Sequence, residues 1–269
     1  MTIYKELKGQ VAVVTGAGRH KGLGEAMARR LALEGVKVVI TDIGTAVGEH
    51  MPESAIGTLN EMNEIVEEIR QAGGEASSFV CNVLNPEEVE AAAKFAVDTY
   101  GSLDIWVNNA GIGYLMKSIL EMPVDEWDSV LGVNLRGVFC GIKYAAIEMV
   151  KLGKRGRIIN IGSQASKSAF AHASAYTSSK HGVVGLTRVA AMELGEHGIN
   201  VNTICPNHIT TGLGAWQNDH FSDVTGKGYD NYMADMRARI PLGRPGLQED
   251  IAKACAFLCS DQANYITGE

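Results

Sequence analysis

The stretch QVAVVTGAGRHKGLGEA, residues 10–26, joins a β-branched apolar run to a glycine-rich turn and then to a helical pattern. β-Branched residues favour a strand, and the glycines allow a tight turn and close approach of the backbone to a ligand. A helix that begins after such a turn directs its free N–H groups and the positive end of its dipole at an anion. The stretch therefore predicts a site for the pyrophosphate of a dinucleotide, formed by Gly16, Gly18, Arg19, Gly22 and Leu23.

Strand-like and helix-like patterns alternate along the rest of the chain. The further strand candidates are VKVVITDI (36–43), EASSFVCNV (75–83), LDIWVNNAG (103–111), RIINIGS (157–163) and INVNTICP (199–206). Strands separated by helices predict right-handed crossovers and a parallel sheet that is covered on both faces. We therefore expect a doubly wound α/β fold of the Rossmann type, with three layers (α/β/α), in a single domain over residues 1–269. The alternation stops at about residues 210–241, where we expect an insertion over the carboxyl edge of the sheet, either a substrate lid or a packed helical excursion.

Composition excludes several classes of function. Hydrophobic residues make up 46% and charged residues 20% of the chain, and the net charge is -7. This balance is typical of a globular domain and disfavours binding to nucleic acid or to an anionic membrane surface. We expect that no apolar run in the sequence is long enough to span a bilayer. The five cysteines and seven histidines show no metal-binding spacing, so we expect reduced thiols, no metal site and a cytoplasmic location.

A tyrosine and a lysine four residues apart lie in SAYTSSKHG (174–182), thirteen residues after Ser163. On a helix this spacing places the ammonium of Lys180 on the same face as the phenol of Tyr176. A nearby cation favours the phenolate, and moving a phenol pKa from ~10 to about 7 corresponds to ~4 kcal/mol. Such a phenol could exchange a proton with an alcohol or ketone oxygen. Taken alone, Ser163 would fit a helix cap better than a catalytic role, and Asn134 would equally fit a polar residue in a helix interior that bonds to backbone.

Asp42 ends the second predicted strand and bears on the choice of dinucleotide. A carboxylate at this place can accept hydrogen bonds from both hydroxyls of the adenosine ribose. It would also repel a 2′-phosphate by ~1–4 kcal/mol at a separation of ~4 Å. Arg19 and Lys21 in the glycine-rich turn would act in the opposite sense. We expect NAD as the cofactor and leave NADP as the alternative.

Several motifs occur together and in a fixed order. They are TGAGRHKGLG (15–24), Asp42, CNV (81–83), NNAG (108–111), the asparagine of VNLRGVF (133–139), IGS (161–163), YTSSK (176–180) and CPNHITT (205–211). With these motifs nearly the whole chain resembles the short-chain dehydrogenase/reductase family. The resemblance implies that Tyr176 is a general acid and base and that Lys180 binds the nicotinamide ribose and lowers the tyrosine pKa. It also implies that Ser163 hydrogen-bonds the reacting oxygen and that Asn134 holds a water in a proton relay.

The resemblance assigns the remaining cofactor contacts as well. It places Asn109 and Gly111 beside a cofactor ribose, Asn82 and Val83 at the adenine, Ile43 beside Asp42, and Ile209 and Thr211 at the carboxamide and phosphates in the loop after Pro206. Three features depart from the family pattern. Five residues rather than three separate Gly16 from Gly22, Pro206 is followed by Asn207 rather than glycine, and relatives continue through one more strand beyond YITGE (265–269).

The function expected from these features is hydride transfer between NAD(H) and a secondary alcohol or ketone. Two alternatives stay open: an NADP-dependent 3-oxoacyl-type ketoreductase and a nucleotide-binding regulator without catalysis. The resemblance further implies a homotetramer or homodimer, and polyols, hydroxyacids, cyclic alcohols and steroids all fit as substrates. His172 and His208 fall in segments that should border the cleft, where a substrate contact and an ordinary histidine are both possible.

Overall fold

The computed structural model describes residues 4–46 and 56–269. Its centre is one parallel sheet in the order β3-β2-β1-β4-β5-β6. The strands are β1 (Val11–Thr15), β2 (Lys37–Asp42), β3 (Glu75–Val80), β4 (Ile105–Asn108), β5 (Gly156–Ile161) and β6 (Ile199–Ile204). The chain turns outward in both directions from β1, so the doubly wound parallel sheet that the sequence predicted is confirmed.

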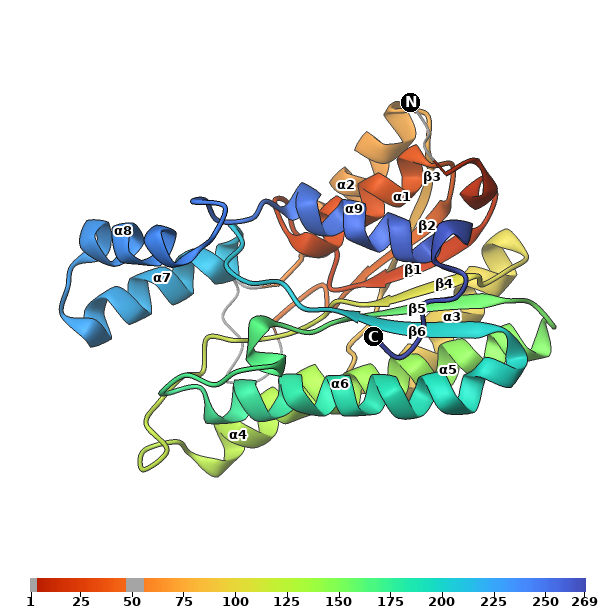
Figure 1. The fold of residues 1–269 in the computed structure, drawn as a ribbon. Coiled ribbons are helices and arrows are strands. Elements are labelled where there is room, and N and C mark those ends of the chain that lie inside the picture. The colour runs from red at the N-terminus through yellow and green to blue at the C-terminus, as the bar shows by residue number, and fades with distance from the viewer. Residues whose placement is uncertain (1–3, 47–55) are drawn as a thin grey trace.

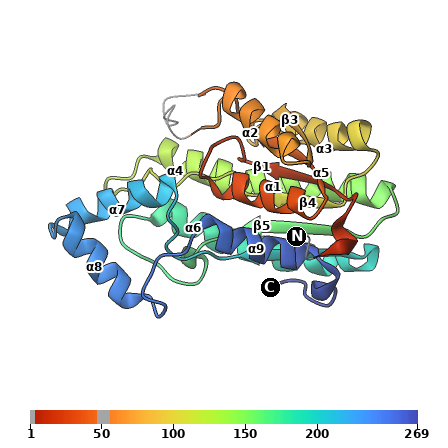
Figure 2. The ribbon, with the colours of Figure 1, turned by 90° about the horizontal axis from the view of Figure 1, so that it is seen from above.

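Helices cover both faces of the sheet (Figures 1 and 2). One layer contains α1 (Leu23–Leu33), α2 (Leu59–Gln71) and α9 (Gln248–Cys259), and the other contains α3 (Pro86–Tyr100), α5 (Gly137–Lys151) and α6 (Ser174–Leu194). Side chains of β1 alternate between the two cores: Val13 packs in the cluster with α3, α5 and α6, and Val14 packs in the cluster with α1, α2 and α9. Both faces are apolar because helices cover both, which explains the continuous apolar runs in the sequence.

A continuous helix runs from α4 (Val124–Leu131) through a π-helical turn (Gly132–Arg136) into α5. Among the described residues, only this helix is long and apolar enough to cross a membrane, with a mean hydropathy of 1.3 over its best window. The expectation that no segment reaches that length was therefore wrong. However, 56% of the window is buried inside the protein, where α5 packs on α3 and on the sheet, so its apolar character is that of a core helix.

A chain of buried polar side chains ties α6 to the middle of the sheet. Trp106 Nε1 donates to Asn108 Oδ1 (2.7 Å), Asn108 Nδ2 donates to Asn160 Oδ1 (2.8 Å), and Asn160 Nδ2 donates to Thr187 Oγ1 (2.8 Å). All four residues are buried, so breaking one link would leave an unpaired polar group away from water at a cost of about 1–3 kcal/mol. The chain therefore fixes the register of α6, the helix that carries Tyr176 and Lys180, against β4 and β5.

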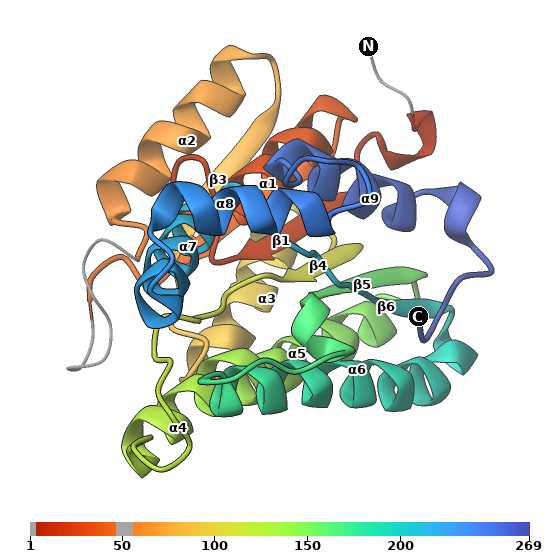
Figure 3. The same cartoon turned by 60° about the vertical axis from the view of Figure 1, so that its left-hand side comes forward.

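Two helices occupy the stretch at about 210–241, where the regular alternation stops. They are α7 (Gly212–Thr225) and α8 (Tyr229–Arg239), and they contact each other. The pair lies beyond the carboxyl ends of the strands, apart from the three main layers (Figures 1 and 3). We refer to α7 and α8 together as the helical lobe.

Candidate functional site

A cleft with a volume of about 740 Å³ lies at the carboxyl ends of the strands. The glycine-rich turn forms one end, the ends of β2, β4, β5 and β6 form the floor, and the helical lobe forms the opposite wall. This is where ligands bind in open parallel α/β sheets.

The glycine-rich turn forms a tight cradle between β1 and α1. Gly16 has a φ of +61°, and a Cβ at this position would lie 2.6 Å from the Cα of Ala110. Asn109 Nδ2 donates to the carbonyl of Gly16 (2.8 Å), which fixes the turn to the end of β4. No side chain caps the N-terminus of α1 at Gly22, so its first N–H groups are available to an anion. The turn therefore fits the pyrophosphate of a dinucleotide.

The two additional residues of the turn are held by acidic residues of α1 and α2. The N–H of His20 donates to Glu61 Oε1 (2.7 Å), and the N–H of Lys21 donates to Glu25 Oε2 (2.5 Å). Lys21 has a φ of +59°, which is unusual for a residue with a side chain. In this conformation Arg19 and Lys21 both line the cleft. The sequence did not indicate that carboxylates hold the turn. The contact with Glu61 joins the turn to α2, which lies about forty residues later in the chain.

His20, Glu25 and Glu68 bring three possible metal ligands within 4.8 Å of one another. Arg29 already lies between the two carboxylates: its Nε donates to Glu25 Oε1 (2.8 Å), and its other nitrogen bonds to Glu68. The guanidinium supplies the positive charge that these carboxylates require. We therefore assign no metal site to the group.

Asp42 lies at the end of β2, beside the glycine-rich turn. Its Oδ2 accepts from the N–H of Gly18 (3.0 Å) and its Oδ1 from the N–H of Ile43 (2.9 Å). Burial raises the pKa of this carboxyl, and the backbone hydrogen bonds and the charge of Arg19 act in the opposite direction. Gly18 packs on Asp42 and is not among the residues that line the cleft, so its contact with the cofactor stays a prediction.

The other residues predicted to contact the cofactor line the cleft together. From the first half of the chain they are Gly16, Arg19, Gly22, Leu23, Asp42, Ile43, Asn82, Val83, Asn109 and Gly111, and from the second half Tyr176, Lys180, Pro206, Ile209 and Thr211. Thr211 has an additional structural role, since its Oγ1 accepts from the N–H of Gly214 (3.3 Å) and caps α7.

Ser163, Tyr176 and Lys180 meet at the carboxyl end of β5. Ser163 follows β5, and its Oγ accepts from the N–H of Ala165 (3.2 Å), so it caps a short turn as well as facing the cleft. Lys180 Nζ donates to the carbonyl of Ile161 (2.8 Å) and lies 5.7 Å from the centre of the Tyr176 ring. Tyr176 and Lys180 are both buried. The structure thus brings Ser163, at the end of a strand, together with the two side chains that the sequence placed on one helix.

The expected direction of the tyrosine pKa is wrong for the protein by itself. Burial raises the pKa of Tyr176 above its ordinary value, and the hydrogen bond with Ser163 opposes this only in part. Lys180 does not reverse the effect, because its ammonium is directed at the Ile161 carbonyl. Burial also lowers the pKa of Lys180 to about 8. At neutral pH the site therefore presents a neutral phenol, suited to donating a proton, beside a buried cation.

Asn134 lies in the π-helical turn and fastens the loop after β4. Its Oδ1 accepts from the N–H of Ile112 (2.8 Å), and its Nδ2 donates to the carbonyl of Ile112 (2.8 Å) and to Ser179 Oγ (3.2 Å). π-Helical turns occur mostly as single turns near functional sites. The side chain does not line the cleft, so its role as the holder of a relay water stays a prediction.

The wall formed by the helical lobe contributes residues that were not predicted individually. Gln217 and Phe221 lie one turn apart on α7, and Tyr232, Met236 and Arg239 follow a stripe on α8. Among the aromatic residues of this stretch, Phe221 and Tyr232 face the cleft, whereas Trp216 stacks on His220 with ring centres 5.0 Å apart. His172 and His208 also line the cleft. The spacing of these residues in the sequence could have indicated that they share one face of a helix. It does not show which face of each helix lines the cleft.

Comparison with known proteins gives consistent matches over nearly the whole chain. A family model described as enoyl-(acyl carrier protein) reductase matches residues 16–269. Cyclohexanol dehydrogenase from Acinetobacter sp. (strain SE19) is 36% identical over 259 residues, which cover 96% of this chain and 91% of that protein. The structure of an NAD+-bound xylitol dehydrogenase superposes with a TM-score of 0.87 at 29% identity, covering 98% of this chain and 96% of that one. The structure of a single-substitution variant of actinorhodin polyketide ketoreductase with NADPH gives a TM-score of 0.85 at 34% identity, covering 100% and 95%.

Proposed function

Because the chain belongs to the short-chain dehydrogenase/reductase family, we propose that it transfers a hydride between NAD(H) and a secondary alcohol or ketone. The observation that carries this proposal is the group of Ser163 with the buried Tyr176 and Lys180, which shares one cleft with the glycine-rich turn. A nicotinamide cofactor is supported by the relatives and fits the residues present. The uncapped start of α1 suits its pyrophosphate, and the buried cation of Lys180 suits a ribose with its hydroxyls.

Each part of the cleft has a proposed part in holding the cofactor. The glycine-rich turn receives the pyrophosphate, Asp42 the adenosine ribose, Asn82 and Val83 the adenine, and Lys180 the nicotinamide ribose. The loop from Pro206 to Thr211 lines the cleft, and we assign it to the nicotinamide end. A bound oxidised nicotinamide supplies the acceptor for the hydride that leaves the carbinol carbon.

The side chains of this protein move the proton and hold the oxygen. In alcohol oxidation Tyr176 Oη takes the hydroxyl proton while the C–H bond breaks, and in ketone reduction it returns that proton to the carbonyl oxygen. Ser163 Oγ hydrogen-bonds the same oxygen and stabilises its developing charge. The Lys180 ammonium, 5.7 Å from the tyrosine ring, stabilises the phenolate when it forms. The raised pKa of Tyr176 suits ketone reduction at neutral pH, whereas alcohol oxidation becomes faster as the pH rises.

An absorbance assay at ~340 nm tests the proposal, because reduced nicotinamide absorbs there and the oxidised form does not. The purified protein is supplied with NAD or NADP and a panel of cyclic alcohols, polyols, hydroxyacids and steroids. Turnover of at least one secondary alcohol with NAD is expected. Tight cofactor binding without turnover of any alcohol or ketone would instead favour the regulator.

The preference for NAD rests on the carboxylate of Asp42. We expect Asp42→Asn to raise the affinity for NADPH relative to NADH by about tenfold or more, because a charge that repels a 2′-phosphate by ~1–4 kcal/mol is removed. The amide oxygen of the variant can still accept from the Gly18 N–H, so the turn keeps its shape. Dissociation constants of the two reduced cofactors, measured by their fluorescence, give the ratio. Arg19→Gln is the companion variant and should shift the ratio in the opposite direction, whereas an unchanged ratio in both would assign the preference to other residues.

The second candidate is an NADP-dependent 3-oxoacyl-type ketoreductase. It is favoured by the position of Arg19 and Lys21, which line the cleft beside Asp42, and by the likeness to a ketoreductase with NADPH. The dissociation constants of the unmodified protein decide between the two candidates, since a ketoreductase of this kind should bind NADPH the more tightly.

We propose a homodimer or homotetramer assembled through α5 and α6. Both helices expose apolar side chains on the outer surface: Phe139 is 48% exposed on α5, and Val189 and Met192 are 51% and 85% exposed on α6. A second copy of the chain would cover these residues and remove apolar area from water. Light scattering at low micromolar concentration should give two or four times the mass of 28.7 kDa, and a monomer would contradict the proposal.

A further inference from the structure

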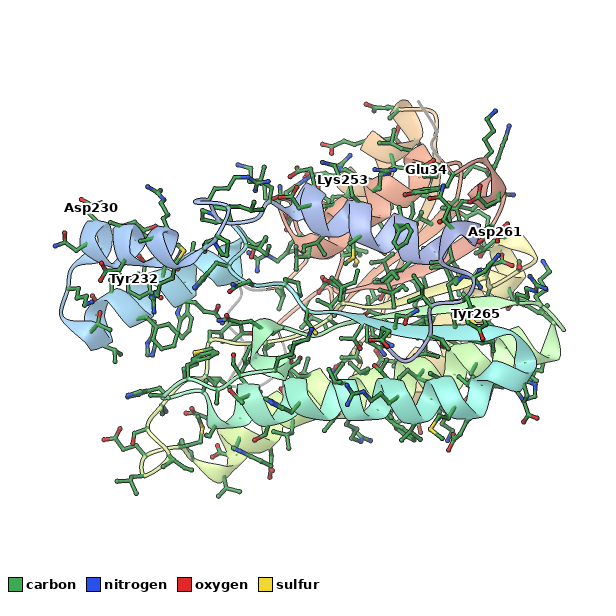
Figure 4. All side chains as sticks on the ribbon, viewed as in Figure 1. Glu34, Asp230, Tyr232, Lys253, Asp261 and Tyr265 are labelled. Atoms are coloured by element: carbon green, nitrogen blue, oxygen red, sulfur yellow. The ribbon has the colours of Figure 1, made fainter. Side chains whose placement is uncertain are left out.

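The half of the cleft beyond Tyr176 has a largely apolar wall. Phe221 and Val224 on α7, together with Tyr232, Met236 and Ile240 at α8 and its end, line it on the lobe side. Tyr232 is among the residues drawn on α8 in Figure 4. Phe170 completes the wall from the loop before α6 and packs edge-on against Phe221, with ring centres 5.6 Å apart. A surface of this kind binds a hydrocarbon skeleton through burial of apolar area.

One charged side chain stands in this apolar half. Among the described residues that line the cleft, the charged groups Arg19, Lys21, Asp42 and Lys180 lie at the turn or beside Tyr176, and Arg239 alone lies on the lobe. Arg239 is exposed, and its Nε donates to the backbone carbonyl of Asp235 (3.3 Å). Arg239 forms no ion pair with a carboxylate of the described residues. The side chain of Asp235 pairs with Lys227 (2.6 Å), and the charge of Arg239 contributes only a smaller part to the lowered pKa of Asp235.

Although Arg239 is exposed, its charge affects groups that line the cleft. It contributes to lowering the pKa of His208, which lines the cleft on the loop after β6, and it opposes the effect of burial on the pKa of Tyr232. Arg239 lines the cleft together with His208 and Tyr232, and its backbone hydrogen bond leaves further donors of the guanidinium over. A guanidinium presents five N–H donors and matches carboxylate or phosphate oxygens in pairs.

We propose that the substrate is a secondary alcohol or ketone with an apolar skeleton and an anionic group at the end remote from the reacting carbon, and that Arg239 binds this anion. The inference rests on the proposed oxidoreductase function and adds the substrate class to it. The reacting carbon lies at Tyr176, the skeleton packs on Phe170, Phe221 and Met236, and the anion reaches Arg239 at the outer end of the lobe. The anion is a carboxylate or a phosphate, which the guanidinium can bind in the same way.

Matched pairs of ketones test this assignment. The probes are 6-oxoheptanoate, 8-oxononanoate and 10-oxoundecanoate, each beside its methyl ester and beside the phosphate monoester of the corresponding hydroxyketone. At the best chain length, kcat/KM for an anionic ketone should exceed that for its ester by about tenfold, which corresponds to a single charge-assisted contact. The preference should fall as salt is added, since the contact is exposed. If the carboxylates show the greater preference over the esters, the anion is a carboxylate; if the phosphate monoesters do, it is a phosphate.

Arg239→Gln and Arg237→Gln are the paired variants. Arg237 lies on the same helix and is exposed, but it does not line the cleft. In Arg239→Gln the preference for anionic ketones should disappear because their KM rises, while the KM of the esters should stay the same. In Arg237→Gln the preference should persist. Equal kcat/KM for anionic and ester substrates, or a preference that survives in Arg239→Gln, would overturn the assignment.

A binding measurement separates this inference from the proposed function. Calorimetry in the presence of NADH compares cyclohexanecarboxylate with cyclohexanecarboxamide, neither of which can react. Tighter binding of the carboxylate that is lost in Arg239→Gln supports the anion site even if no ketone in the panel is reduced. Reduction of ketones without any anion preference in either measurement would leave the oxidoreductase function in place and reject the anion site.

Discussion

Tyr176→Phe is expected to lower kcat by about 10²–10⁴-fold, the range that general acid–base catalysis contributes in enzymes. The variant removes only the hydroxyl that we propose exchanges the proton, and it keeps the ring that packs against Met116 and Ala173. Because the hydroxyl does not hold the glycine-rich turn, the dissociation constant of the cofactor should change little. Turnover is followed by absorbance of the reduced nicotinamide, and cofactor binding by its fluorescence.

Tyr144→Phe is the matched control for this experiment. Tyr144 is half-buried on α5, outside the cleft, and should tolerate the same change without loss of kcat. The unmodified protein should also show faster alcohol oxidation as the pH rises, because burial raises the pKa of Tyr176 and the phenolate is the form that accepts the proton. If Tyr176→Phe kept kcat within tenfold, another group would have to be the acid and base.

Lys180→Met is expected to weaken cofactor binding and yet to raise the free energy of unfolding at pH 7. Burial lowers the pKa of Lys180 from 10.5 to about 8, so the folded protein holds a charge that its surroundings disfavour. A depression of that size corresponds to ~3 kcal/mol, at ~1.4 kcal/mol for each pKa unit. Removing the charge therefore stabilises the folded protein, but the variant also loses the hydrogen bond to the buried Ile161 carbonyl, which lowers the free energy of unfolding by ~1–2 kcal/mol. The net increase, measured by urea unfolding, should be about 1–2 kcal/mol.

The pH dependence of the free energy of unfolding tests independently whether the pKa of Lys180 is lowered. Between pH 8 and 10.5 the unfolded chain holds more protons at this lysine than the folded protein does, so the unmodified protein gains stability from Lys180 as the pH rises through this window. Lys180→Met lacks this gain of ~3 kcal/mol, which exceeds the net advantage of the variant at pH 7. The difference between the two proteins should therefore shrink, pass through zero and reverse toward pH 10.5. Lys253→Met on α9, where the side chain is 66% exposed, should show no such trend (Figure 4). A difference that stays constant with pH would contradict the lowered pKa.

The sequence was sufficient for the fold because its determinants are local. The buried five-residue run of β1 and the glycines that follow it define the first strand and turn without reference to the rest of the chain. The order of the later motifs then placed Ser163, Tyr176 and Lys180 in one cleft, and their positions in the structure agree with that placement.

Features that depend on contacts between distant elements were not predicted. The spacing of Tyr176 and Lys180 puts both on one helical face, but it does not show that Ile161, on another element, accepts the ammonium hydrogen bond. The π-helical turn at Asn134 depends on a loop that lies 22 residues earlier in the chain. Arg239 gained significance only once the packing of α8 on α7 showed which side of α8 lines the cleft.

The residues proposed to carry out the reaction and the residues proposed to select the substrate stand largely on different elements. Tyr176 and Lys180 stand on α6, which Asn160 and Thr187 lock to the sheet, whereas Arg239 and the apolar wall stand on a helix pair outside the three main layers. Trp216 and Phe221 of α7 pack against the cluster that contains Tyr176, so substitutions on α8 rather than on α7 are expected to change which molecules are accepted without disturbing the proposed proton transfer.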